Sequence, residues 1–110
     1  MISWTDFEKV DLRAGTVVEV EDFPEARRPS YKLWIDFGES IGIKKTSAQL
    51  TKLYSKQDLK NRQVICVTNF PPRQIGTFMS EVLLTGFPNA AGEVVLASID
   101  KNVPNGVKLF

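Results

Sequence analysis

Apolar and polar residues alternate along several short segments of this chain, which predicts a protein built mainly of β-strands. In the clearest segment, residues 31–37, Leu33, Ile35 and Phe37 share one face while mostly polar residues occupy the other. Further strands are expected at residues 16–20, at 41–47, on either side of Pro71-Pro72 and at 94–99. A chain of 110 residues supports one hydrophobic core, so residues 1–110 are expected to form a single domain.

Helical signals are short and few. Residues Thr5–Glu8 have the spacing of a capping box, and Ser55–Asp58 repeat that signal before Asn61, which can take the left-handed stop position. Apolar residues at 50, 53 and 54 predict a further helical segment. Five or six short strands with a helical segment between the third and the fourth predict an OB-fold, a five-stranded Greek-key barrel, here with a short N-terminal helix and a C-terminal extension.

A stiff corner interrupts the second half of the chain. Pro71 and Pro72 fix φ twice in succession and hold Phe70 in an extended conformation. Polar residues lie around this corner within an otherwise apolar frame. Because buried polar groups must be hydrogen-bonded, these residues are expected to bond to one another or to face a ligand or a second subunit. They are Asn69, Arg73, Gln74, Ser80 and Glu81.

The net charge is only +1, but the charges are unevenly distributed. Residues 1–25 hold two cations and seven anions, whereas residues 26–63 hold nine cations and three anions. The basic block at 26–63 also contains Tyr31, Trp34 and Tyr54. Most charge runs are solvated faces, but cations interleaved with aromatic residues are also typical of nucleic-acid binding.

The composition excludes several kinds of site. The chain has no histidine, which removes Ser-His-Asp and Cys-His catalysis and every histidine-dependent zinc site. The lone Cys66 lies in an apolar strand, where a buried and unreactive thiol is expected. No signal peptide or membrane span is recognised, so a cytoplasmic protein is expected. Because no set of residues meets the requirements of a catalytic site or a metal site, no catalytic role, metal or cofactor is expected.

Several motifs together resemble a known family. The segment 11–19, followed by Tyr31-Lys32-Leu33 and Asp36-Phe37-Gly38, is similar to the opening of the tRNA-binding OB domain, which occurs as free dimers and appended to some aminoacyl-tRNA synthetases. Residues 23–27, 41–49, 69–76 and 103–106 resemble, within that family, the CsaA family of export-related chaperones. Synthetase-type domains read Ser-Glu-Gly-Met in strand five. Here Val82-Leu83 follows Ser80-Glu81, which favours the CsaA branch.

The resemblance implies a non-enzymatic homodimer that acts as an export-associated chaperone, binding unfolded preproteins and the export ATPase. The wider family implies an alternative, a tRNA-binding protein that uses the basic face of the OB-fold. Strands two and three usually form the ligand face of an OB-fold, and in this chain they lie within the basic block. The residues expected to bind peptide or tRNA are therefore Arg27, Arg28, Lys32, Trp34, Lys44, Lys45, Ser47 and Gln49.

Simpler roles remain open for several of these residues. Trp34 can stack on a ligand, or it can pack against the N-terminal helix or a partner subunit. Arg73 can contact a ligand or a second subunit, or it can pair with Glu81. The residues expected at the groove edge or the dimer contact are Asn69, Phe70, Arg73, Gln74, Ser80 and Glu81.

Overall fold

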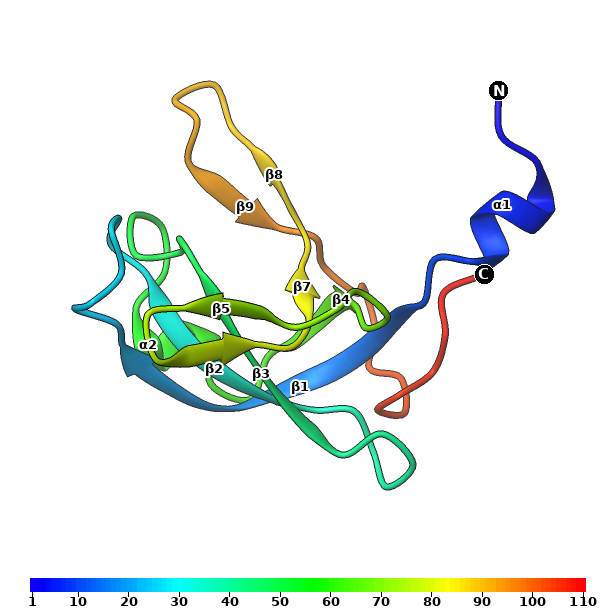
Figure 1. The fold of residues 1–110 in the computed structure, drawn as a ribbon, viewed down its shortest axis with the longest axis horizontal. Helices are drawn as coiled ribbons and strands as arrows, with labels where there is room; N and C mark the ends of the chain where they lie inside the picture. Colours follow the sequence, from blue (N-terminus) through cyan, green and yellow to red (C-terminus); the bar gives the residue numbers. More distant parts are fainter.

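The computed structural model describes residues 1–110 and has at its centre a curled antiparallel sheet that forms a nearly closed barrel (Figure 1). The strand order is β3-β2-β1-β4-β7. The bounds are β1 Leu12–Asp22, β2 Tyr31–Asp36, β3 Ile43–Ala48, β4 Gln63–Val67 and β7 Leu83–Leu84. The barrel closes next to β3, where the Glu81 N–H donates to the Lys45 carbonyl oxygen at 2.8 Å and the Lys45 N–H donates to Glu81 Oε1 at 3.0 Å. The predicted OB-fold is confirmed.

The inner face of the barrel holds the core. Leu33 and Ile35 of β2 are fully buried, as the alternation predicts. Thr46 is also buried, and its hydroxyl donates to the Val82 carbonyl oxygen at 2.7 Å, so the polar group is satisfied. Cys66 is buried as expected, and burial raises the pKa of its thiol to about 12, which keeps the thiol protonated and unreactive at neutral pH.

The helices agree only partly with the sequence prediction. Helix α1 (Trp4–Glu8) is capped by Ser3 with Asp6, two residues earlier than the expected box. Helix α2 (Lys56–Leu59) has the predicted cap. The helical segment expected at 50–54 is reduced to a single turn. The Tyr54 N–H donates to the Leu50 carbonyl oxygen at 3.1 Å, while the Tyr54 side chain and carbonyl bond to β9 (Val94–Leu96) and β2. Its hydroxyl accepts from the Leu96 N–H at 3.0 Å, and its carbonyl accepts from the Tyr31 hydroxyl at 2.9 Å.

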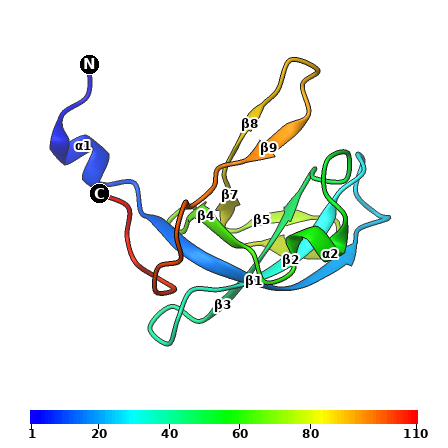
Figure 2. The same cartoon turned by 180° about the vertical axis from the view of Figure 1, so that it is seen from behind.

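Two hairpins replace the simpler strands expected after the prolines. The first pairs β5 (Arg73–Ile75) with β6 (Phe78–Ser80), and Gly76 turns the chain between them with a φ of 61°. The second pairs β8 (Gly86–Pro88) with β9 (Val94–Leu96), so the strand predicted at 94–99 is shorter and has a partner that alternation did not reveal. Figures 1 and 2 show this second hairpin and α1 projecting from the same side of the barrel.

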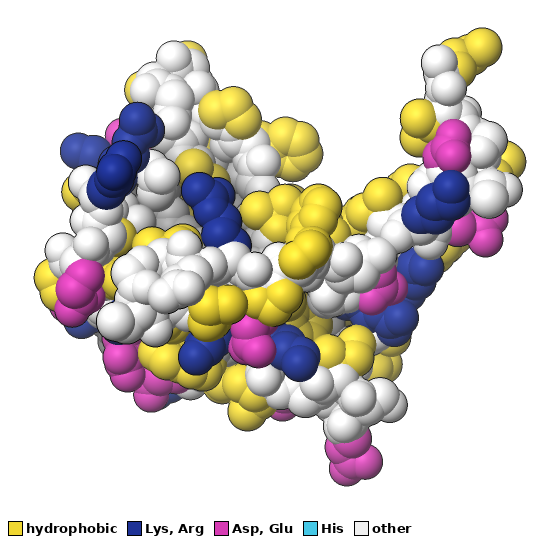
Figure 3. All heavy atoms as spheres, viewed as in Figure 1, with side chains coloured by type: hydrophobic (Ala, Val, Ile, Leu, Met, Phe, Trp, Pro, Cys, Tyr) yellow, Lys and Arg dark blue, Asp and Glu magenta, His cyan; other side chains and the backbone are white.

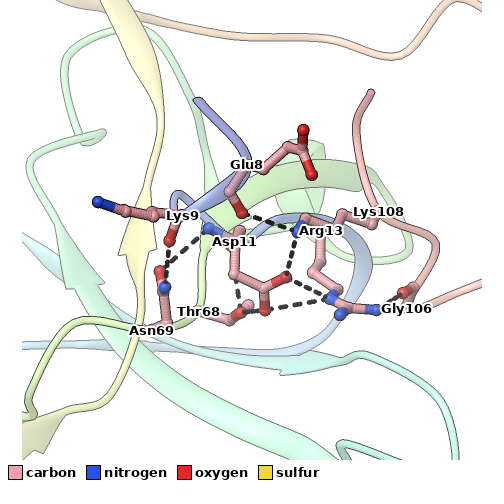
Figure 4. Close-up of polar contacts among 8 residues, drawn as sticks. All are labelled: Glu8, Lys9, Asp11, Arg13, Thr68, Asn69, Gly106 and Lys108. Atoms are coloured by element: carbon pink, nitrogen blue, oxygen red, sulfur yellow. Dashed lines mark hydrogen bonds and ion pairs between the residues drawn. The ribbon is translucent and has the colours of Figure 1, made fainter. Parts of the chain in front are cut away.

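The two ends of the chain leave the barrel together and are held by a polar clamp around Asp11 (Figure 4). The Asp11 carboxylate accepts from Arg13 Nε at 3.0 Å and from the Thr68 hydroxyl, and Lys108 Nζ lies 3.9 Å from it. Burial acts to raise the pKa of Asp11, but the hydrogen bonds from Arg13 and Thr68 and the charges of Arg13 and Lys108 hold this pKa below its usual value.

Asn69 belongs to this polar clamp. Its side-chain oxygen accepts from the Asp11 N–H at 3.1 Å, and its amide donates to the Lys9 carbonyl oxygen at 2.7 Å. The start of the proline corner therefore fixes the chain between α1 and β1. Neither helix is long and apolar enough to cross a membrane.

Candidate functional site: an arginine-lined groove

A groove of about 550 Å³ lies between the β5–β6 hairpin, the β8–β9 hairpin and the loop that joins β1 to β2. We call it the arginine groove, because Arg27 and Arg28 from that loop and Arg73 from β5 line it together. In Figure 3, one group of Lys and Arg side chains lies beside the β8–β9 hairpin, and others lie elsewhere on the same face. Ser47 and Gln49, at the end of β3, line the same groove.

The charged residues of the arginine groove are all of one sign. No Asp or Glu lines it, and the ion pairs of the structure involve other cations, namely Lys9, Arg13, Lys56 and Lys108. Of the two roles considered for Arg73, pairing with Glu81 does not occur, since the Glu81 carboxylate accepts from the Lys45 N–H instead. All three arginine side chains are exposed and their charges are uncompensated, which favours an anionic ligand group.

Apolar side chains complete the arginine groove. They come from β5, β7 and β9 and include Ile75, Leu83, Leu84, Val94 and Leu96. A site with apolar walls and a few charged groups can bury an apolar side chain and orient a charged one. Sequence reasoning missed this wall, although the apolar run Val94–Leu96 was a signal for it.

A second cavity of about 400 Å³ adjoins the arginine groove and shares Arg73 and Ser47 with it. Its lining includes Phe70, Ser80 and Glu81, so it collects four of the residues expected at a groove edge. Ser80 lies 3.0 Å from the buried Thr46 hydroxyl, and Glu81 bonds to β3. Both polar groups therefore hold the barrel closed under the proline corner.

Three of the expected ligand contacts lie instead against the β5–β6 hairpin. Phe78 of this hairpin is buried, with its ring centroid 6.1 Å from that of Trp34 and 5.4 Å from that of Phe23. The Nζ atoms of Lys32 and Lys45 lie 5.4 and 5.3 Å from the Phe78 centroid. We call these residues the Phe78 cluster. Trp34 is thus in contact with the hairpin, a neighbour that neither reading of the sequence named.

The remaining predicted residues lie apart from the arginine groove. Lys44 points to the face of β3 opposite Lys45, because successive residues of a strand alternate. The Gln74 amide donates to the Gly76 carbonyl oxygen at 2.9 Å and stabilises the hairpin turn. The structure thus brings Arg27, Arg28, Arg73, Ser47 and Gln49 into one site and leaves the others beside it.

A separate apolar surface lies where the two chain ends meet. A cavity of about 1090 Å³ there is lined by Ile2, Trp4, Phe7, Leu109 and Phe110, among others. Trp4 is 81% exposed and Phe110 is fully exposed, although large apolar side chains are usually covered. We call this surface the terminal face. It has no partner within the chain.

The model of the putative tRNA binding domain family matches residues 12–108. A solved structure of the chaperone CsaA from Bacillus anthracis is 46% identical, with a TM-score of 0.93 over 100% of this chain and 99% of that one. The CsaA chaperone protein from Picrophilus torridus is 48% identical, with a TM-score of 0.92 over 100% of both chains. Methionine–tRNA ligase 1 of Bacillus anthracis is 38% identical over 109 residues, which is 98% of this chain but only 16% of the ligase.

Proposed function

This chain belongs to the putative tRNA binding domain family, and on that premise we propose that it is a non-enzymatic, export-associated chaperone that binds unfolded preproteins as a homodimer. The arginine groove carries this proposal, because apolar walls next to uncompensated cations suit a polypeptide with mixed side chains. The solved relatives described as CsaA chaperones support it over the whole length of the chain. The export ATPase is proposed as a partner and the cytoplasm as the location.

The expected affinity for one groove is low. Full burial of an apolar side chain contributes about 1.5–3 kcal/mol. Association itself costs on the order of 4–15 kcal/mol. Three or four bound side chains therefore give weak, reversible binding, which suits a chaperone that must release its client. A homodimer presents two grooves to one long chain and raises the avidity without new contacts.

The terminal face supports the homodimer. We expect light scattering at micromolar concentration to give twice the chain mass of 12.4 kDa. Trp4→Asp should shift the mass towards the monomer, since a carboxylate would be buried in the interface. Leu53→Asp, at a side chain 40% exposed on a distant turn, should leave the mass unchanged. A monomeric mass for the unmodified chain would remove the homodimer from the proposal.

Binding of tRNA is the second candidate, and the ligase relatives favour it. The two functions differ in their dependence on salt. For an RNA that contacts four or five phosphates, log K should fall against log[salt] with a slope of about −0.7 per contact. Capture of a peptide through apolar walls should depend much less on salt. Titration of a fluorescent unfolded peptide and of fluorescent tRNA over one salt series separates them. Tight, steeply salt-dependent tRNA binding with no peptide binding would overturn the chaperone proposal.

A further inference from the structure

The charged side chains that line the arginine groove are all positive. Three arginines line it, no carboxylate does, and none of the three takes part in an ion pair. An arginine guanidinium binds a carboxylate through two parallel hydrogen bonds, and it repels a cationic side chain. A peptide segment that carries a carboxylate therefore fits this groove, and one that carries lysine or arginine does not.

The apolar walls require a second feature of the ligand. Leu83 is 51% exposed on β7, beside the largely apolar lining contributed by β9. Burial of an apolar side chain against this wall is favourable, and a phosphate backbone offers no such group. The volume of about 550 Å³ is within the usual range for ligand pockets, roughly 300–1,000 Å³.

The free edge of β3 supplies main-chain groups. β3 is an edge strand of the sheet, and the Glu81 N–H bonds to Lys45 on its outer side. Ser47 directs its N–H and C=O to that same side, because alternate residues of an antiparallel strand do so. No strand pairs with Ser47 there, since the chain after Val82 turns away to pair with β4. An extended peptide can continue this edge, as in β-strand addition.

From these observations we infer that the arginine groove binds extended peptide segments in which an apolar side chain lies next to Asp or Glu. This inference rests on the proposed chaperone function and names the part of the preprotein that is recognised. Signal peptides begin with a basic region, which the three arginines repel. The recognised segments are therefore acidic and apolar stretches of the mature part of the preprotein.

The test uses fluorescein-labelled peptides of equal length with repeats of Leu-Ser-Glu, Leu-Ser-Gln or Leu-Ser-Lys. At physiological ionic strength, the full chain should bind the Glu peptide about tenfold more tightly than the Gln peptide, because charge-assisted hydrogen bonds are stronger than neutral ones. The Lys peptide should bind more weakly than either. Binding is measured by fluorescence anisotropy.

Substitutions inside and outside the arginine groove test whether the preference for the Glu peptide arises there. Arg73→Gln should remove most of the tenfold preference for the Glu peptide while changing the affinity for the Gln peptide by no more than about twofold. Lys60→Gln removes one exposed cation outside the groove and should leave the preference intact. Arg27→Gln provides a second groove variant, and thermal unfolding of each variant shows whether it folds.

The outcomes separate this inference from the function on which it rests. Equal affinity for the Glu and Gln peptides, or loss of the preference in Lys60→Gln but not in Arg73→Gln, would overturn the inference and leave the chaperone function standing. Absence of binding for every peptide would overturn both. Binding of RNA that weakens in Arg73→Gln, with no peptide selectivity, would assign the groove to RNA.

Discussion

Replacement of Phe78 by alanine is expected to lower the free energy of unfolding by about 3 kcal/mol, at the lower end of the range for a buried phenylalanine. Phe78 is 7% exposed, and its ring contacts Phe23 and Trp34. It holds the β5–β6 hairpin against the outer face of β2 and β3. The ammonium groups of Lys32 and Lys45 near its ring add cation–π attraction that alanine also removes.

Guanidinium unfolding followed by circular dichroism measures this loss. Met79→Ala is the matched control, because Met79 follows Phe78 in β6, points to the other face and is 37% exposed. It should cost less than about 1 kcal/mol, as a substitution of an exposed side chain. In a Trp4→Phe background, Phe78→Ala should also make the Trp34 fluorescence more sensitive to acrylamide. Equal losses for the two alanine variants would show that Phe78 does not anchor the hairpin.

The Phe78 cluster contains a contact that the sequence-based site prediction did not anticipate, that of Lys32, Trp34 and Lys45 with the β5–β6 hairpin. Alternation correctly places Lys32 and Trp34 outside the barrel, since this depends only on the period of the strand. The outward face of β2 is covered by the β5–β6 hairpin, which is far away in the sequence. Local sequence patterns do not predict such a contact. The signal for it was an aromatic residue, Phe78, in the short segment after the prolines, and aromatic side chains are usually packed.

The barrel itself could be predicted because its elements follow from local patterns. Leu33 and Ile35 alternate into the core, and Ser55 and Asp58 form the predicted cap of α2. That the segment 50–54 stops after one turn could not be predicted, because the Tyr54 carbonyl and hydroxyl accept hydrogen bonds from β2 and β9. Tertiary contacts of this kind override helical propensity.

The sequence indicated the charged residues of the arginine groove but not that they lie together. Arg27 and Arg28 belong to the basic block, and Arg73 follows the proline corner, so their charges were apparent separately. Their convergence requires the β5–β6 hairpin to fold back over the barrel. The prolines make this possible, because they fix the direction in which the chain leaves β4. The corner therefore acts on the site through Arg73, while Asn69 at its start serves the polar clamp.

Replacement of Asp11 by asparagine is expected to lower the free energy of unfolding by about 2 kcal/mol at neutral pH, because hydrogen bonds to charged groups contribute roughly 1.5–3 kcal/mol and the amide keeps part of them. The carboxylate accepts from Arg13 and Thr68 and lies near Lys108, and an amide nitrogen would face the Arg13 guanidinium. Asp100→Asn, at an exposed acid without an ion pair, is the control and should be nearly neutral.

The loss of unfolding free energy caused by Asp11→Asn should become smaller as the pH falls. The pKa of Asp11 in the folded protein lies below its value in the unfolded chain, which is about 3.9. The folded state therefore favours the ionised form, and the stabilisation is complete above the unfolded pKa and lost as the pH falls through the folded pKa. The difference in unfolding free energy between the unmodified chain and Asp11→Asn should be constant from about pH 5 to pH 8 and should shrink below about pH 4.

The clamp also predicts where the protein opens first in acid. Lys108 and the Gly106 carbonyl oxygen meet Asp11 and Arg13, so protonation of Asp11 loosens the C-terminal tail before it affects the barrel. Hydrogen exchange at low pH should therefore rise at residues 106–109 and at the Ala14 N–H, which donates to the Val107 carbonyl oxygen, while the amides of β2 stay protected. Because this tail forms part of the terminal face, the same loosening should weaken the proposed homodimer. Acid exchange that begins in the barrel, with the tail still protected, would contradict this role for Asp11.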